Sequence, residues 1–165
     1  MRRLFNIWPP FRAAGIRVRE IAPDFRSATV ELRMRLFNRN YVGTHFGGSL
    51  FAMTDPFFMI MMMKNLGPDY VVWDKEGTVR FLKPARGTVI ARFQLHEERI
   101  AEARALTESG AKHEPVFRVE IVDASGATVA DVAKTLHIRR RHSREGGNPV
   151  GARTRASSGF PPTRE

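Results

Sequence analysis

The chain has no cysteine among its 165 residues, so it forms neither disulfides nor thiolate metal sites. It also has no long apolar run. The most apolar segment, 49–63, is interrupted by Thr54-Asp55-Pro56 and is shorter than the roughly 20 residues that span a bilayer. The N-terminus carries two arginines but no apolar stretch of signal-peptide length. We therefore expect a cytoplasmic protein without a membrane partner.

Acidic residues are outnumbered, 17 against 27 Lys and Arg, and the net charge is +10. Residues 139–165 hold 7 Arg and only 2 Glu, and they are rich in Gly, Ser and Pro with little to bury. Such a segment cannot offset its ordering entropy, which predicts a disordered basic tail after one domain at 1–138. A nucleic-acid-binding tail is the alternative, but we expect no nucleic-acid partner.

Period-two alternation of apolar and polar side chains predicts half-buried antiparallel strands. It is clearest from Ser27 to Leu36, and turn-forming segments separate several of the runs. The predicted strands are 16–21, 27–36, 70–84, 88–95, 116–122 and 128–138.

Segment 49–67 is apolar around nearly its whole circumference, which predicts a buried helix that ends at Gly67-Pro68. Segment 97–106 predicts a short surface helix with acidic residues in its first turn. Trp8-Pro9-Pro10-Phe11 fits a helix start or an extended lid, and the sequence leaves both open. The fold class is therefore α+β, an antiparallel sheet wrapped around one long buried helix.

Gly47 and Gly48 stand where the buried helix should begin. Backbone N–H groups in the first turn of a helix have no intrahelical acceptor, and a glycine lets a ligand approach closely. Such amides stabilise a developing oxyanion. The alternative is that the two glycines only make the turn into the helix.

Asp55 is the only acidic residue between Glu31 and Asp69, and it interrupts an otherwise apolar helix. Buried carboxylates are rare unless they are paired or functional. Asp followed by Pro is also typical of a helix N-cap, so Asp55 could instead restart or kink the helix at Pro56.

In a continuous helix, Gly48 and Asp55 would lie roughly 10 Å apart, too far to act on one carbonyl group within a single chain. A symmetric assembly with antiparallel helices would bring Asp55 of one subunit near the glycines of another. If the site is real, the protein should be a homodimer or a homotetramer.

The pattern Asn40-x-x-Gly43-Thr44-x-x-Gly47-Gly48, followed after seven residues by Asp55, resembles the active-site segment of hot-dog-fold acyl-CoA thioesterases. The phenylacetyl-CoA thioesterase type is the nearest characterised branch. Over about 130 residues, the chain is also similar to an uncharacterised hot-dog family often labelled tetrameric acyl-CoA thioesterase. The matching segments are 8–10, 38–50, 53–56, 72–75 and 135–138.

This resemblance implies a hot-dog fold and hydrolysis of a fatty or aryl acyl-CoA, with coenzyme A entering only as part of the substrate and no separate cofactor. It implies that the Gly47 amide polarises the thioester carbonyl. It further implies that Asp55 of a partner subunit is the general base or nucleophile, and that Asn40 helps to place substrate or water.

Other residues near this segment are candidates for substrate binding. Gly48 and His45 flank the expected oxyanion site, and Lys83 and Arg86 could meet the phosphates of coenzyme A. The histidines are too scattered for a metal site, so none is expected. Two other functions stay open. One is a non-catalytic acyl-CoA or lipid-binding protein, and the other is a dehydratase that pairs His45 with Asp55.

Overall fold

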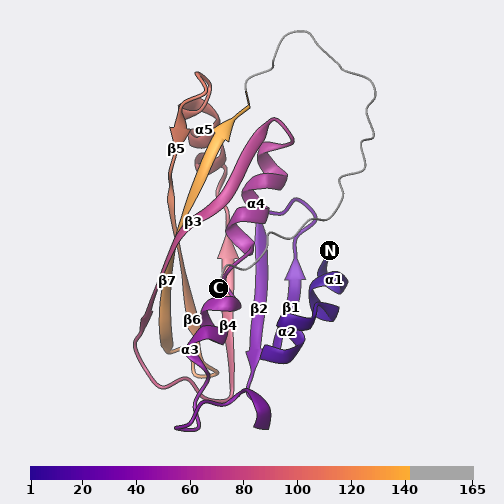
Figure 1. Cartoon of the computed structure of the whole chain (residues 1–165), viewed down its shortest axis with the longest axis vertical. Coiled ribbons are helices and arrows are strands. Elements are labelled where there is room, and N and C mark those ends of the chain that lie inside the picture. The colour runs from indigo at the N-terminus through magenta and orange to yellow at the C-terminus, as the bar shows by residue number, and fades with distance from the viewer. Residues whose placement is uncertain (142–165) are drawn as a thin grey trace, which may run out of the picture.

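The computed structural model describes residues 1–141. Seven strands form one antiparallel sheet in the order β1-β2-β4-β6-β7-β3, and β5 pairs with β7 (Figure 1). The elements are α1 (Arg2–Ile7), α2 (Pro9–Ala14), β1 (Ile16–Ile21), β2 (Ser27–Arg33), a 3-10 turn η1 (Leu36–Asn38), α3 (Gly47–Ala52), α4 (Phe57–Leu66), β3 (Tyr70–Phe81), β4 (Thr88–Gln94), α5 (Glu97–Leu106), β5 (Lys112–His113), β6 (Val116–Val122) and β7 (Thr128–Arg140).

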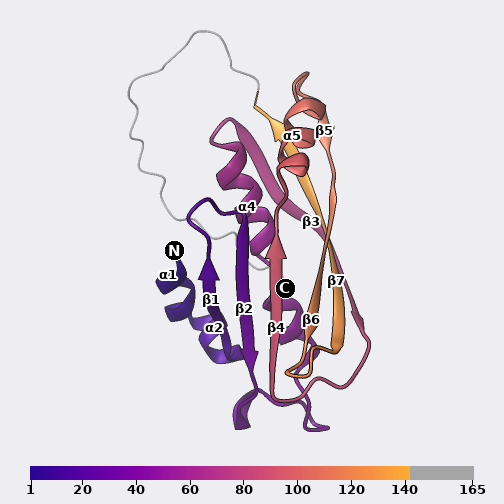
Figure 2. The same ribbon diagram turned by 180° about the vertical axis from the view of Figure 1, so that it is seen from behind.

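The central helix at 47–66 lies against one face of the curled sheet, and Figure 2 shows the sheet from behind with β4 along its middle. Aromatic side chains join the two layers. Phe57 and Phe58 of α4 pack on Phe93 of β4 with ring centroids 4.8 and 5.2 Å apart, and Phe58 also stacks on Phe117 of β6 at 4.9 Å. Because all four rings are buried, the predicted α+β fold with a buried central helix is confirmed.

Residues 53–56 form a turn that divides the central helix into α3 and α4. The amides of Thr54 and Asp55 bond three residues back, to Phe51 O at 2.9 Å and Ala52 O at 3.3 Å. Pro56 has no N–H, and the regular pattern resumes at Ile60. Pro56 therefore interrupts the helix, and the Asp55 side chain makes no cap hydrogen bond to α4.

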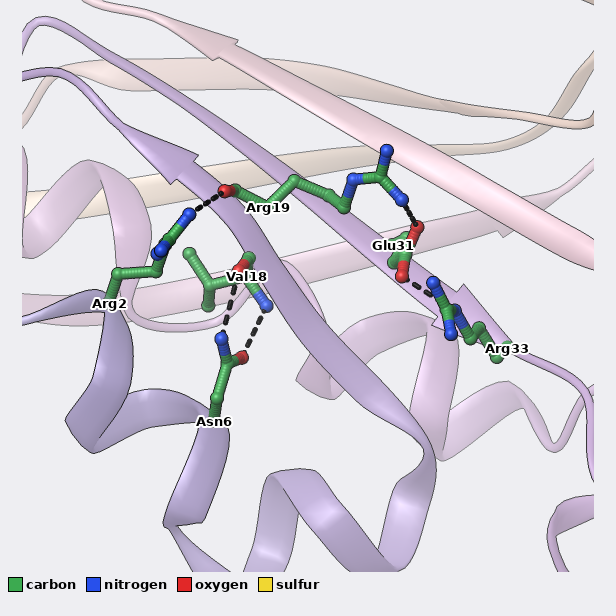
Figure 3. A network of polar contacts seen from close by, with 6 residues as sticks. All are labelled: Arg2, Asn6, Val18, Arg19, Glu31 and Arg33. Atoms are coloured by element: carbon green, nitrogen blue, oxygen red, sulfur yellow. Dashed lines mark hydrogen bonds and ion pairs between the residues drawn. The ribbon is translucent and has the colours of Figure 1, made fainter.

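The N-terminal segment, for which the sequence left two readings, forms the two short helices α1 and α2 at the β1 edge of the sheet (Figure 1). Asn6 fixes α1 to that edge: its Oδ1 accepts from Val18 N–H at 2.8 Å, and its Nδ2 donates to Val18 O at 3.0 Å (Figure 3). Arg2 adds a bond to Arg19 O. The helix thus occupies backbone groups that an edge strand would otherwise expose.

Glu31 is only 3% exposed, although the alternation of β2 places it among the polar positions. Its carboxylate pairs with Arg19 at 2.9 Å and Arg33 at 2.6 Å, and Figure 3 shows both guanidinium groups reaching it. The two arginines cover the acid and compensate its burial.

Three predicted boundaries are wrong by a few residues. The strand predicted at 27–36 ends at Arg33. Asn38 Oδ1 accepts a hydrogen bond from Arg35 N–H, and Asn38 Nδ2 donates one to Arg33 O, so the chain turns into η1. The strand predicted at 70–84 ends at Phe81. The strand predicted at 128–138 continues to Arg140, where it still pairs with β3. The rest of the predicted basic tail, 142–165, lies outside the described residues. No helix within 1–141 is long and apolar enough to cross a membrane.

Candidate active site

A cavity of about 590 Å³ lies between the loop that leads into α3 and the connection that follows β3. Five of the residues singled out from the sequence line it, although they come from two segments about 40 positions apart. These five are Asn40, His45, Gly47, Lys83 and Arg86. Gly48 and Asp55 do not line this cavity.

Asn40 folds the loop that forms one wall of the cavity. Its Oδ1 accepts from Thr44 N–H at 2.9 Å, and its Nδ2 donates to Thr44 Oγ1 at 2.8 Å and to His45 O at 3.2 Å. Both side-chain N–H groups are used within the loop. Asn40 therefore positions the residues that precede Gly47.

His45 is buried and joins this loop to the segment after β3. Its Nε2 lies 2.8 Å from Gly87 O, and its backbone N–H donates to Ala85 O at 2.9 Å. Burial lowers the pKa of His45 below 6.5, although the Gly87 carbonyl acts in the opposite direction. The ring is thus neutral at pH 7, and Nε2 carries the proton that Gly87 accepts, which leaves Nδ1 as an acceptor.

Gly47 begins α3, and the bonds of the first turn start after it, with Ser49 N–H and Leu50 N–H donating to Phe46 O. A Cβ atom on Gly47 would lie 2.8 Å from Phe81 Cζ, so the absence of a side chain keeps this corner of the cavity open. Gly48 is exposed beside Phe46, outside the cavity. Of the two glycines, Gly47 is therefore the one that lines the cavity, and its backbone N–H belongs to the first turn of α3.

Lys83 and Arg86 supply the positive charge of the cavity wall, and both side chains are exposed. Arg86 Nη1 donates to Gly43 O at 3.1 Å, which fixes the guanidinium group at the loop that carries Gly47. Its remaining N–H groups can meet an anion at the entrance of the cavity.

Asp55 follows α3, outside the cavity, and forms an ion-pair cluster with a lysine of β7. Lys134 Nζ donates to Asp55 Oδ1 at 2.7 Å and lies 3.2 Å from Asp74 Oδ1 of β3. The lysine side chain is 3% exposed and the Asp55 side chain is 54% exposed. A buried cation thus holds one oxygen of a carboxylate whose side chain is more than half exposed.

The surroundings of Lys134 explain how a lysine is tolerated at this place. Its ammonium group lies 5.0 Å from the centroid of the Phe51 ring, a favourable cation–π contact. A Cβ atom on Gly77 would lie 2.5 Å from the Phe51 ring, so the glycine leaves room for that ring. Burial raises the pKa of Asp74, whereas Lys134 acts to lower it. Asp74 is therefore the second anion that compensates the buried cation.

The Asp55 cluster and the cavity lie at different levels of β3. Lys134 is paired with Gly77, and the cavity begins at Phe81, four residues further along the strand. Four residues of extended chain span about 13 Å. One chain therefore does not bring the Asp55 carboxylate to the Gly47 amide.

Lys134 is the residue of this cluster that sequence reasoning missed. It occupies an inward position in the alternation of β7, between the buried residues Val132 and Leu136. A lysine on the apolar face of a predicted strand indicates a buried ion pair, and this signal was present in the sequence. Its partner Asp55 could not be deduced, because 79 positions separate the two residues.

The model of a family described as a domain of unknown function, DUF4442, matches residues 1–138. The chain belongs to the DUF4442 family. No curated protein matches it.

Solved structures that this DUF4442 protein resembles include several described as thioesterases. A probable thioesterase of unknown function, PA5026 from Pseudomonas aeruginosa, has a TM-score of 0.73 and 23% identity over 85% of this chain and 93% of that chain. The thioesterase HI1161 from Haemophilus influenzae has a TM-score of 0.62 and 13% identity over 88% of this chain and 92% of that chain. The PaaI protein of the phenylacetic acid degradation operon of E. coli has a TM-score of 0.57 and 20% identity over 85% of this chain and 89% of that chain.

These similarities identify the fold of the DUF4442 protein as the hot-dog fold. At such low identity they establish the architecture alone. The chemistry of this chain has to be argued from its own residues.

Proposed function

We propose that this protein is a thioesterase that hydrolyses a fatty or aryl acyl-CoA. The observation that carries the proposal is the division of the site into two halves. One half is a cavity with the Gly47 amide on its wall and Lys83 and Arg86 beside it. The other is the Asp55 carboxylate, held by Lys134. Together they provide the parts that thioester hydrolysis requires: an oxyanion donor, cations for phosphates, and a base.

A second copy of the chain would bring the two halves together. β3 is the last strand of the sheet, and its outer side has no partner among residues 1–141. If two copies pair antiparallel along β3 about a two-fold axis near Val79, Gly77 of one copy lies opposite Phe81 of the other. Asp55 then lies at the level of the partner's cavity.

The surface beside the cavity fits such pairing because it is apolar and exposed. Its side chains range from 49% to 105% exposed, and large exposed apolar patches mark sites of contact with other molecules. The residues are Tyr41, Val42, Phe46, Phe81 and Leu82.

The reaction then follows from the two halves. The free oxygen of Asp55 takes a proton from water as the water oxygen attacks the thioester carbon. The carbonyl oxygen becomes an oxyanion and accepts a hydrogen bond from the Gly47 N–H. Collapse of the intermediate breaks the carbon–sulfur bond and releases the thiolate of coenzyme A, which takes up the proton held by Asp55. Direct attack by Asp55 through an anhydride would use the same two groups.

Lys83 and Arg86 would bind the phosphates of coenzyme A, and Asn40 would keep Gly47 in place through the loop. In this mechanism His45 has a different role from the proton transfer that a dehydratase would require of it. Its Nε2 proton is engaged with Gly87, and its pKa is lowered, so the ring is a poor proton donor at pH 7. We therefore assign His45 to positioning the cavity wall.

The test compares two carboxylates that contact the same lysine. We expect Asp55→Asn to lower the hydrolysis rate of acyl-CoA substrates by about 100-fold or more, since the base is lost. Asp74→Asn changes the same ion-pair cluster but leaves the base in place, so it should retain most of the rate. Hydrolysis is followed by thiol release over a panel of acyl chain lengths.

The outcomes separate the thioesterase from the second candidate function, a non-catalytic acyl-CoA-binding protein. That candidate is favoured by one observation: the ion pair with Lys134 engages one oxygen of Asp55. Acyl-CoA binding without turnover in the wild type, unchanged by Asp55→Asn, would support the binding protein and refute the thioesterase. Equal loss of rate in both variants would assign Asp55 a structural role only.

A further inference from the structure

Helix α1 turns an apolar face to solvent, which is unusual for a helix at the surface of a sheet. Phe5 points into the core, where it stacks with Phe11 and Phe57 at 5.6 and 5.7 Å. Asn6 and Arg2 point along the edge of β1 (Figure 3). The side chains left on the outer face are large, apolar and 47% to 67% exposed. They are Met1, Leu4, Ile7 and Trp8.

These side chains line an open apolar groove of about 660 Å³, together with Pro56 and Ile60 of the central helix. The groove is separate from the cavity at Gly47, and the two share no lining residue. It therefore needs an explanation that the proposed hydrolysis does not provide.

Basic side chains flank the apolar face. Residues 1–20 contain five arginines and a single acid, Glu20. Two basic recesses border α1 and α2. One is lined by Arg2, Arg3, Arg17 and Arg19, and the other by Arg12, Arg17, Arg33 and Arg35. An apolar strip beside dense positive charge is complementary to a surface that is apolar inside and anionic outside.

We propose that α1 and α2 dock on an anionic membrane surface. Met1, Leu4, Ile7 and Trp8 enter the boundary between headgroups and acyl chains. Arg2, Arg3, Arg12 and Arg17 bind the lipid phosphates, whereas Arg19 and Arg33 are paired with Glu31. Tryptophan favours this boundary because its ring is apolar and its N–H needs a polar partner. This proposal replaces the expectation of no membrane partner, which rested on the lack of a spanning segment. Docking in the plane of the membrane needs no such segment, so it is compatible with the absence of a spanning helix from residues 1–141.

Charge favours this partner over two others. Two copies that met through this face would bring ten arginines of residues 1–20 together against two glutamates, so like-charge repulsion opposes self-association there. A nucleic acid would satisfy the arginines but would leave four large apolar side chains without a contact. An anionic bilayer satisfies both kinds of residue.

The experiment measures partitioning of the full chain to vesicles of phosphatidylcholine with and without phosphatidylglycerol. We expect binding that requires phosphatidylglycerol and weakens with salt. The double variant Leu4→Glu with Ile7→Glu should lower partitioning at least tenfold, because it places charge on the inserting face. Arg3→Gln with Arg17→Gln should lower it about 25-fold, at roughly fivefold for each cation.

Matched controls lie elsewhere on the surface. Leu106→Glu changes an exposed leucine of α5, and Arg92→Gln removes an exposed arginine of β4. Both should bind vesicles as the wild type does. The chain has two tryptophans, so Trp73→Phe leaves Trp8 as the single reporter, whose emission should shift to the blue on anionic vesicles.

Three results would overturn the proposal. Vesicle binding that is equal in the wild type and in the Leu4→Glu, Ile7→Glu variant excludes insertion of α1. Loss of binding on replacing Arg144, Arg153, Arg155 and Arg164 by glutamine, with α1 intact, assigns membrane binding to the C-terminal tail. A smaller oligomer in the Leu4→Glu, Ile7→Glu variant, with no vesicle binding by the wild type, identifies the groove as an interface between copies. None of these results depends on hydrolysis.

Discussion

At the scale of single residues, His45 shows how burial sets a charge state. Its ring lies in the loop before the central helix and donates to the Gly87 carbonyl. The pKa of His45 is lowered because the cationic ring would lose its hydration. The folded protein therefore excludes a proton that the unfolded chain accepts near pH 6.5.

This difference makes stability depend on pH. As the pH falls from 6.5 toward the lower pKa of folded His45, the unfolded state binds a proton and the folded state does not. The free energy of unfolding should therefore decrease with falling pH, by up to about 1.4 kcal/mol per pH unit for this group. Above pH 6.5 the contribution is fully present. His45→Gln removes the titrating group, so denaturant unfolding at pH 7 and pH 5 should show a smaller difference than in the wild type.

His113 contributes in the same direction, because burial also lowers its pKa. The single variant His113→Gln and the double variant separate the two contributions. Asp74 has the opposite dependence, since burial raises its pKa above 3.8 and its contribution to stability increases as the pH falls. A pH difference that His45→Gln leaves unchanged would show that the ring is not buried in its neutral form.

At the scale of elements, Gly15 links α2, β1 and the end of β2. It has a φ of +82°, which other residues rarely adopt. A Cβ atom there would overlap Asn38 Nδ2 and lie 2.7 Å from Arg33 O. Asn38 in turn bonds Ala14 O and Arg33 O, both at 2.7 Å, so its amide group has no room to move away.

We expect Gly15→Ala to lower the free energy of unfolding by about 3 kcal/mol, through backbone strain and loss of the Asn38 bonds. Gly126→Ala is the matched control. Gly126 also has a positive φ, +84°, but nothing lies within 4 Å of its Cβ position, so strain alone should cost about 1 kcal/mol. Urea unfolding measures both values. Equal losses would mean that Asn38 adapts to the added methyl group.

Most of these elements could be predicted, because alternation and the helical period depend on burial alone. Strands 16–21 and 116–122 and helix 97–106 have the predicted bounds. The end of β2 could not be predicted, since Met34 and Leu36 continue the alternation while Asn38 breaks the strand through distant bonds. Local sequence also did not reveal β5, which has two residues and exists only by pairing with β7.

The candidate site was predictable to a similar degree. The glycines and polar residues from Asn40 to Gly47 form a local pattern, and the structure gathers Lys83 and Arg86 into the same cavity. Asp55 stood out because an acid is rare in an apolar helix. Its ion pair with Lys134 joins segments far apart in sequence, which no local pattern encodes.

At the scale of the whole molecule, the proposed site depends on pairing along β3. The chain has no cysteine, so a single introduced thiol reports on its own neighbourhood. Residues at the same position on two antiparallel strands meet only near the two-fold axis. Val79→Cys should therefore cross-link two copies under mild oxidation, because opposed Cβ atoms in such strands lie about 5 Å apart.

Arg92→Cys, an exposed position on β4 inside the sheet, should give monomers on a non-reducing gel. Mixing two inactive variants, Asp55→Asn and Gly47→Val, provides a functional readout of the same assembly. If the two variants pair at random, half of the dimers contain one copy of each. In such a dimer one of the two sites has both Asp55 and Gly47, so the mixture should recover about a quarter of the wild-type rate. No recovery would place both groups in one subunit.

The attachment of α1 to β1 limits how this protein can aggregate. With Val18 bonded by Asn6 and Arg19 by Arg2, a further strand cannot hydrogen-bond along that margin of the sheet. Growth of a sheet by adding chains needs two open margins on every subunit. Within residues 1–141 the long open margin is that of β3, since β5 has two residues. Pairing along β3 consumes it in both partners, so strand addition stops at two chains and cannot propagate into a fibre.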